Sequence, residues 1–146
     1  MFSRSIRAAL AISIFGLALT ALPASNPPTA AAAGCLRISA TNFDGPGNDN
    51  YQLNGEWVRI KNTCSSGKGV GGWKIHDYNR IHTYTFPAGT RIGAGSSITL
   101  YSGKGSNTAT KRYWGRSYGA VWNNDPPEYA YLRNASGALV SKKTEY

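Results

Sequence analysis

Acidic residues are scarce in this sequence. Its 146 residues include 16 Lys and Arg but only 7 Asp and Glu, which gives a formal net charge of +9. The acids are dispersed, and no two have the local context of a glycosidase carboxylate pair. Such an excess of positive charge favours association with anionic polymers, such as nucleic acid or acidic wall polymers, or with lipid head groups. The same charge can also serve solubility alone, so both interpretations stay open.

Cysteine and histidine are also rare, with two of each. Cys35 and Cys64 lack the CxxC spacing of a zinc site, and we expect neither a metal centre built on them nor a cofactor. In an oxidising compartment an even number of cysteines argues for a disulfide. Cys35 begins one strand-like run and Cys64 ends another, so antiparallel pairing of these runs would join the two sulfurs.

One long apolar run lies at the amino terminus, over residues 8–22, and Arg4 and Arg7 precede it. The run is short for a membrane span, which needs about 20 apolar residues. Basic residues followed by a short apolar run and small residues are typical of a secretory signal peptide. Cleavage after Ala24 or after Ala33 fits the sequence equally well. An uncleaved amino-terminal anchor is the alternative.

This interpretation divides the chain into a signal peptide with a short Ala- and Pro-rich stub, residues 1–33, and one domain, residues 34–146. Loss of Arg4 and Arg7 would leave 14 of the 16 basic residues against 7 acids, a net charge of +7. We therefore expect a basic, secreted protein without a membrane span after cleavage. The sequence does not indicate an oligomeric state.

The remainder of the chain has strand patterns and no convincing helix. Apolar and polar residues alternate over 36–40, 58–61, 73–76, 97–101 and 130–133. In the first of these runs, Leu36, Ile38 and Ala40 would share one face. Glycine-rich segments separate the runs, at 45–48, 67–72, 93–95 and 103–105. Eight or nine short strands with frequent turns predict an all-β protein of two packed antiparallel sheets.

A series of aromatic motifs punctuates these strands. In order they are Leu-Asn-Gly-Glu-Trp-Val-Arg-Ile-Lys-Asn-Thr at 53–63, Gly-Trp-Lys-Ile-His-Asp at 72–77, Tyr-Thr-Phe-Pro-Ala-Gly-Thr at 84–90, Tyr-Ser-Gly-Lys-Gly at 101–105, Tyr-Trp-Gly at 113–115, Val-Trp-Asn-Asn at 121–124 and Leu-Arg-Asn-Ala-Ser-Gly at 132–137. Taken together they resemble the lamin-tail domain in its bacterial, secreted form. The sequence departs from that pattern at 124–128, where Asn-Asp-Pro-Pro-Glu replaces Asn-x-Gly-Asp and the two prolines stiffen the turn.

The resemblance implies an immunoglobulin-like antiparallel β-sandwich that acts as a non-catalytic interaction module. Related animal domains contact other proteins and DNA, and bacterial ones occur alone or attached to secreted nucleases and other hydrolases. Within such a sandwich, four large aromatic residues are expected in the core because each lies within a strand or ends one. They are Trp57, Trp73, Phe86 and Trp122.

The best binding candidate combines three cations with aromatic residues. It consists of Lys111, Arg112, Tyr113, Trp114 and Arg116. This composition suits a site that grips phosphates while it stacks on bases or sugar rings. The alternative is that the two aromatic residues are structural anchors and the cations are simply solvated.

A catalytic interpretation rests on the two histidines. His76 and Asp77 would lie solvated at a strand end, and with Arg80 they could serve a small secreted nuclease or other hydrolase. His82 alternates with aromatic residues, which predicts a hydrogen-bonded and partly buried side chain instead. We expect no enzyme activity, because the sequence contains no stronger catalytic constellation than this one.

One loop has the composition of a calcium site. Asp44, Asn48 and Asp49 supply hard oxygen donors among glycines, but their spacing is not that of an EF-hand. A flexible turn is therefore favoured there.

The sequence as a whole favours a secreted binding module for an anionic polymer or a cell-surface protein. A small secreted hydrolase and a purely structural envelope protein are the alternatives.

Overall fold

Short strands and turns make up the part of the chain that the computed structural model describes, which is residues 34–48, 50–122 and 127–145. Residues 1–33, where we expect the signal peptide, lie outside it, as do Asp49 and residues 123–126. Among the described residues, no helix combines the length and apolar character that a membrane span requires.

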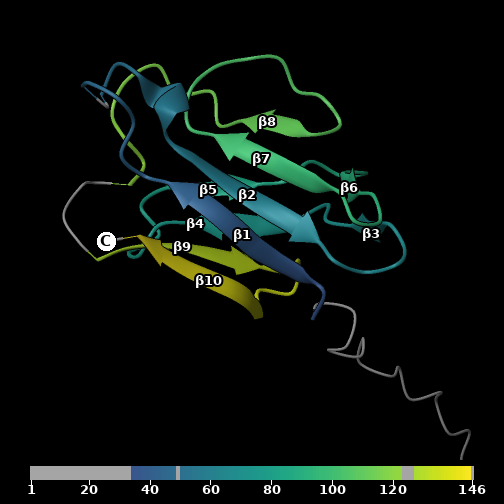
Figure 1. The fold of residues 1–146 in the computed structure, drawn as a ribbon. Coiled ribbons are helices and arrows are strands. Elements are labelled where there is room, and N and C mark those ends of the chain that lie inside the picture. Colours follow the sequence, from purple (N-terminus) through teal and green to yellow (C-terminus); the bar gives the residue numbers. More distant parts are fainter. Residues whose placement is uncertain (1–33, 49, 123–126, 146) are drawn as a thin grey trace, which may run out of the picture.

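The elements in chain order are β1 (Leu36–Asn42), the 3-10 turn η2 (Leu53–Gly55), β2 (Trp57–Asn62), β3 (Lys68–Gly69), β4 (Lys74–His76), β5 (Thr83–Thr85), β6 (Arg91–Ile92), β7 (Ser97–Tyr101), β8 (Lys111–Tyr113), β9 (Glu128–Arg133) and β10 (Leu139–Glu145). Two four-stranded sheets, with orders β1-β2-β7-β8 and β10-β9-β4-β5, form an immunoglobulin-like sandwich (Figure 1). All pairings are antiparallel except that of β7 with β8. The β3–β6 pair lies at the end of the sandwich where β2 ends.

The pairing of β1 with β2 confirms the expected disulfide. Leu36 lies opposite Asn62, so the residues just beyond this pair meet, and the Cα atoms of Cys35 and Cys64 are 5.3 Å apart in the disulfide. Thr63 donates its backbone N–H to the carbonyl of Cys35 at 2.8 Å, which continues the ladder past the strand ends. The bridge closes a loop with a sequence separation of 29.

A bulge interrupts the alternation in β1. Leu36 and Ile38 are buried as expected, but the register shifts between Ile38 and Ala40. Ala40 therefore pairs with Arg59, an outward-facing residue of β2, and is only half-buried. The expectation that Ala40 shares the core face is wrong, because one extra residue in a strand moves the next side chain to the other face.

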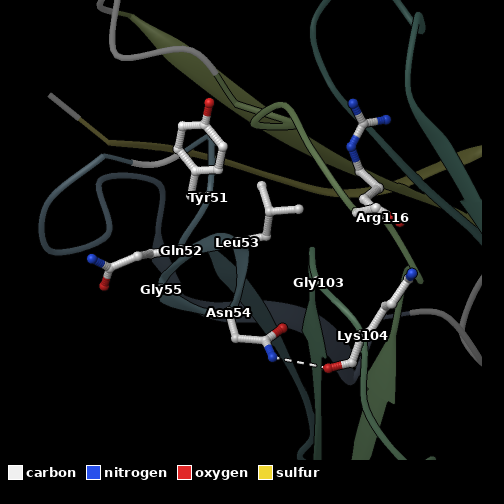
Figure 2. A pocket seen from close by; sticks show the side chains of 9 residues that line it. Tyr51, Gln52, Leu53, Asn54, Gly55, Gly103, Lys104 and Arg116 are labelled. Carbon is white, nitrogen blue, oxygen red and sulfur yellow. Dashed lines mark hydrogen bonds between the residues drawn. The ribbon is translucent and has the colours of Figure 1, made fainter.

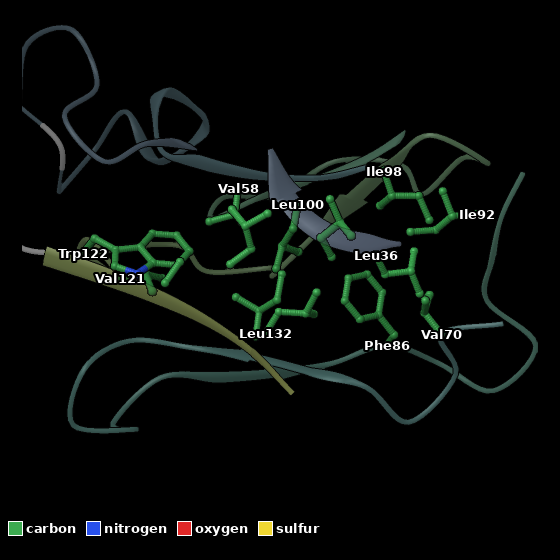
Figure 3. Packing of buried hydrophobic residues seen from close by; sticks show 14 of the residues in the cluster. Leu36, Val58, Val70, Phe86, Ile92, Ile98, Leu100, Val121, Trp122 and Leu132 are labelled. Carbon is green, nitrogen blue, oxygen red and sulfur yellow. The ribbon is translucent and has the colours of Figure 1, made fainter. Parts of the chain in front are cut away.

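Buried side chains from both sheets fill the space between them (Figure 3). Phe86 and Trp122 are fully buried and Trp73 packs against the cluster with part of its surface, which confirms three of the four expected core aromatics. Trp57 is the exception. Its neighbour Val58 takes the core position, so Trp57 lies on the outer face of the first sheet and is only half-buried.

A buried carboxylate connects the start of β2 to a distant segment. The η2 turn, which contains Asn54 and Gly55, places Glu56 in the interior. Its two carboxylate oxygens accept the backbone N–H groups of Val121 and Trp122, each at 3.0 Å. These hydrogen bonds satisfy two backbone N–H groups of a segment that forms no strand.

Candidate functional site: a basic sheet face

Positive charge is segregated in the sandwich. The four strands of the first sheet, all of them described, carry five basic residues and no acidic one. The described acids are Asp44, Glu56, Asp77, Glu128 and Glu145. Asp44, Asp77 and Glu145 lie at or shortly after the ends of β1, β4 and β10. Glu56 and Glu128 lie at or just before the starts of β2 and β9. Because β1 pairs antiparallel with β2, and β9 with β4 and β10, all five positions belong to the same end of the sandwich. The other end and the first sheet are thus left cationic.

Four of the sheet's cations share its outer face because they alternate with buried residues. We call Arg37, Arg59, Lys61 and Lys111 the basic face. Arg37 lies directly opposite Lys61, and Thr99 alone separates Arg59 from Lys111 across the strands. Like charges placed opposite each other destabilise a sheet. The arrangement therefore costs stability that a bound anion would restore.

Two of these cations are held in place. Arg59 donates from Nε to the hydroxyl of Thr99 at 3.2 Å, and its guanidinium lies 5.0 Å from the centre of the Trp57 ring. Lys61 donates from Nζ to the carbonyl of Gly95. Neither partner is a carboxylate, so both side chains keep their full positive charge for an external anion.

An aromatic row lies beside the basic face. Trp57, Tyr101 and Tyr113 are cross-strand neighbours, and the two tyrosine rings stack at 5.3 Å with an interplanar angle of 19°. Gly105 lies so close to Tyr113 that a Cβ at position 105 would collide with the tyrosine ring. Since the stack covers one face of each tyrosine ring, the row braces the sheet more than it offers stacking surfaces.

The five residues predicted as a binding site do not share one surface. Lys111 and Tyr113 face outward, whereas Arg112 pairs with the buried Leu100 and Trp114 packs against the core. Arg116 lies in the loop after β8. What the sequence prediction missed was the contribution of the other strands, because Arg37, Arg59 and Lys61 are far from Lys111 in the chain. Their outward alternation, together with the lack of nearby acids, was the available signal.

Arg112 instead lines a groove at the edge of the sandwich. This groove, of about 530 Å³, lies between the segments 87–90 and 107–109. Burial raises the pKa of Tyr84, and the positive charge of Arg112 partly counteracts that rise. The Arg112 side chain therefore lies near the junction of the two sheets and not on the basic face.

The predicted catalytic residues are buried. His76 is 3% exposed and Asp77 5%, so the expectation that they are solvated is wrong. Asp77 Oδ2 pairs with His82 Nδ1 at 2.9 Å, and the partly buried, hydrogen-bonded state expected of His82 is confirmed. The ring of His76 stacks on Tyr131 at 5.0 Å. Neighbouring groups therefore cover the side chains of His76 and Asp77, and a polymer cannot contact them.

Arg80 takes the left-handed backbone conformation, with φ of 62°, in the exposed turn between β4 and β5. Burial lowers the pKa of His76, and the nearby charges of Arg133 and Arg80 act in the same direction. Hydrogen bonding to the Asp77 carbonyl and the charge of Asp77 oppose that effect. The histidine is therefore held as a neutral, structural side chain.

The calcium candidate can be followed only in part, because Asp49 lies outside the described residues. Asn48 organises a turn: its side-chain oxygen accepts the N–H of Asn50 at 3.1 Å, and its carbonyl accepts those of Tyr51 and Gln52. Within 34–48, 50–122 and 127–145, no group of three or more His, Cys, Asp or Glu is placed to hold a metal ion.

Comparison with known proteins agrees with this architecture. No curated protein matches the chain at a significant level of similarity. The sequence profile of the Lamin Tail Domain, a family of immunoglobulin-like domains, matches residues 29–146 and thus covers every strand described above. The chain therefore belongs to the lamin tail domain family.

Proposed function

We propose that this protein is an exported, non-catalytic binding module that holds an anionic polymer, a nucleic acid or a cell-wall polymer, on its basic face. One observation carries the proposal: a four-stranded sheet with five basic residues and no acid, in which Arg37 and Lys61 lie directly opposite each other. Export through the segment 1–33 is consistent with the Cys35–Cys64 disulfide, since disulfides persist in oxidising compartments.

The binding mode follows from the chemistry of the face. Cations on one face of a sheet can contact successive anionic groups of a chain and release the counterions condensed on it. For duplex DNA, each phosphate contact contributes about −0.9 to the slope of log K against log salt concentration. Affinity on the basic face should therefore fall steeply as salt rises.

The test is a variant with three cations neutralised, Arg37→Gln, Lys61→Gln and Lys111→Gln. Affinity for DNA and for an acidic wall polymer would be measured over a range of salt concentrations. We expect at least a tenfold loss at low salt and a salt slope that is shallower by up to about 3, since each lost contact removes about 0.9. Arg59 is left intact because it packs on Trp57.

The matched control removes the same amount of charge from the second sheet and its hairpin, through Lys74→Gln, Arg80→Gln and Lys143→Gln. It should retain most of the affinity, because only general attraction is reduced. Equal losses in both variants would contradict the placement of the site. Incubation of the protein with nucleic acid, with and without a divalent metal, tests the non-catalytic part, which cleavage would disprove.

A further inference from the structure

Three loops enclose a groove at the end of the first sheet where β2 starts and β7 ends. Its volume is about 500 Å³. The lining residues are Tyr51, Gln52, Leu53, Asn54, Gly55, Gly103, Lys104, Arg116 and Ser117. Figure 2 shows the side chains of Tyr51 and Arg116 on either side of Leu53. The groove adjoins the aromatic row, since Gly55 lies two positions before Trp57 in the chain.

Hydrogen bonds between the loops make this groove a preformed one. Asn54 donates from Nδ2 to the carbonyl of Lys104 at 3.0 Å, and Gly119 donates its N–H to the carbonyl of Asn50 at 3.2 Å. At Gly103 a Cβ would collide with Oδ1 of Asn54, so a larger residue there would displace the Asn54 side chain that donates to Lys104. A site that is already ordered loses little conformational entropy when a ligand binds.

The lining combines an aromatic wall with neutral polar groups. Tyr51 is 73% exposed and meets Tyr118, which is 61% exposed, edge to face at 5.3 Å. The amides of Gln52 and Asn54 and the hydroxyl of Ser117 supply both donors and acceptors. A sugar ring has an apolar C–H face and a rim of hydroxyl groups, and these match an aromatic wall and amide side chains.

Two cations complete the lining. Arg116 is held by its own loop, with Nε donating to the Gly119 carbonyl at 2.9 Å and Nη2 to the Tyr118 carbonyl at 3.4 Å. A guanidinium has five N–H donors, so three remain for a ligand. With the exposed Lys104, they would bind a carboxylate or phosphate group.

We infer that this groove binds one anionic sugar unit, a hydroxylated ring with a carboxylate or a phosphate. The inference rests on the proposed function, because it identifies the anionic polymer as an acidic glycan. A glycan lying across the basic face would pass the aromatic row and place a unit in the groove. In the aromatic row the rings of Tyr101 and Tyr113 stack on each other, so the row offers few open faces for successive bases, and the amides and hydroxyl of the groove lining favour a sugar instead.

Short probes test the groove separately from the face. An oligouronate, a sugar-phosphate oligomer, the neutral methyl ester of the oligouronate and a single-stranded oligonucleotide would each be titrated into the protein while its backbone amide NMR signals are recorded. We expect one or both anionic sugars to shift the signals of Gln52, Asn54, Gly103 and Gly119, and the neutral ester to bind at least tenfold more weakly. The two anionic probes distinguish carboxylate from phosphate.

The groove variants are Tyr51→Ala and Lys104→Gln, each at an exposed position where the fold should tolerate it. Each should weaken the anionic sugar at least tenfold, whereas the matched Tyr78→Ala and Lys74→Gln should not. The Arg37, Lys61 and Lys111 variant should still bind the short sugar.

Three results would overturn the inference: no binding of either anionic sugar, signal shifts confined to the basic face, or an oligonucleotide that occupies the groove more tightly. The proposed function fails on a different result, unchanged retention of the polymer when the basic face is neutralised. The two failures are therefore distinguishable.

Discussion

Arg133 donates a hydrogen bond from Nε to Nε2 of His76 at 3.0 Å. The other ring nitrogen, Nδ1, lies 2.6 Å from the carbonyl of Asp77 and must carry the proton to donate to it. Both nitrogens of this buried ring are thus engaged in its neutral form. A second proton, on Nε2, would point at the Arg133 guanidinium and break the hydrogen bond.

This contact predicts a loss of stability in mild acid. Burial lowers the pKa of His76 below its ordinary value of 6.5, so the folded protein binds fewer protons than the unfolded chain. The free energy of unfolding should therefore decrease as pH falls below about 6.5 and stop decreasing below the folded pKa. Urea unfolding between about pH 8 and pH 5 measures it, a range that stays above most carboxylate titration.

Two variants assign that pH dependence. His76→Gln should flatten the profile, because its side-chain oxygen can accept the Arg133 hydrogen bond without titrating. His82→Gln, at the partly exposed histidine, is the control and should keep the slope due to His76. An unchanged slope in His76→Gln would show that another group is responsible.

Glu56→Gln tests the buried carboxylate. The amide can accept one of the two N–H groups that Glu56 accepts, and its NH₂ group would then face the other donor. We expect a loss of about 1 to 3 kcal/mol in the free energy of unfolding, because one buried N–H is left unpaired. Glu145→Gln is the control, since Glu145 accepts the Phe43 N–H through one oxygen, a role that the amide oxygen can retain. Equal effects of the two substitutions would contradict this account.

The first and last tryptophans of the chain, Trp57 and Trp122, should differ in their contribution to stability. Trp122→Ala removes a fully buried side chain and should cost about 3 to 5 kcal/mol. Trp57→Ala removes a half-buried ring of the outer face and should cost about 1 kcal/mol. Chemical unfolding followed by circular dichroism, which does not depend on the missing fluorophore, compares the two variants. A larger loss for Trp57→Ala would place that residue in the core after all.

Alternation predicted five of the ten described strands, β1, β2, β4, β7 and β9, because it is a local pattern. The disulfide was predictable because its two cysteines flank two of these runs. Alternation failed where one residue changes the phase: the bulge after Ile38 turns Ala40 outward. Trp57 was misplaced for a related reason, since its aromatic character was given more weight than its position next to the inward Val58. Strand phase is a better guide to burial than side-chain size.

The candidate site was less predictable because it depends on contacts between distant segments. Arg37, Lys61 and Lys111 become neighbours only through the order β1-β2-β7-β8. The groove likewise needs the loops around Asn54 and Arg116 to meet. The residues of the cluster Lys111–Arg116 are adjacent in sequence, which predicts a common site, but strand alternation places them on different surfaces.

Removal of the disulfide should lower stability substantially. With a sequence separation of 29, the chain-entropy model gives a stabilisation of about 3 to 4 kcal/mol. The variant Cys35→Ser with Cys64→Ser should lose about that amount in urea unfolding. The same loss should appear in the natural protein under a strong reductant, and the double variant should not respond to the reductant. A reductant effect on the double variant would contradict this explanation.

The position of the disulfide also determines how the domain would respond to pulling. Cys35 lies just before β1 and Cys64 just after β2, so a force applied at the amino end passes through the sulfur bridge into the neighbouring strand. The hydrogen bonds between β1 and β2 are then bypassed and are not opened one after another from that end. A domain tethered by its amino-terminal side could thus carry a mechanical load while its outermost strand stays in place.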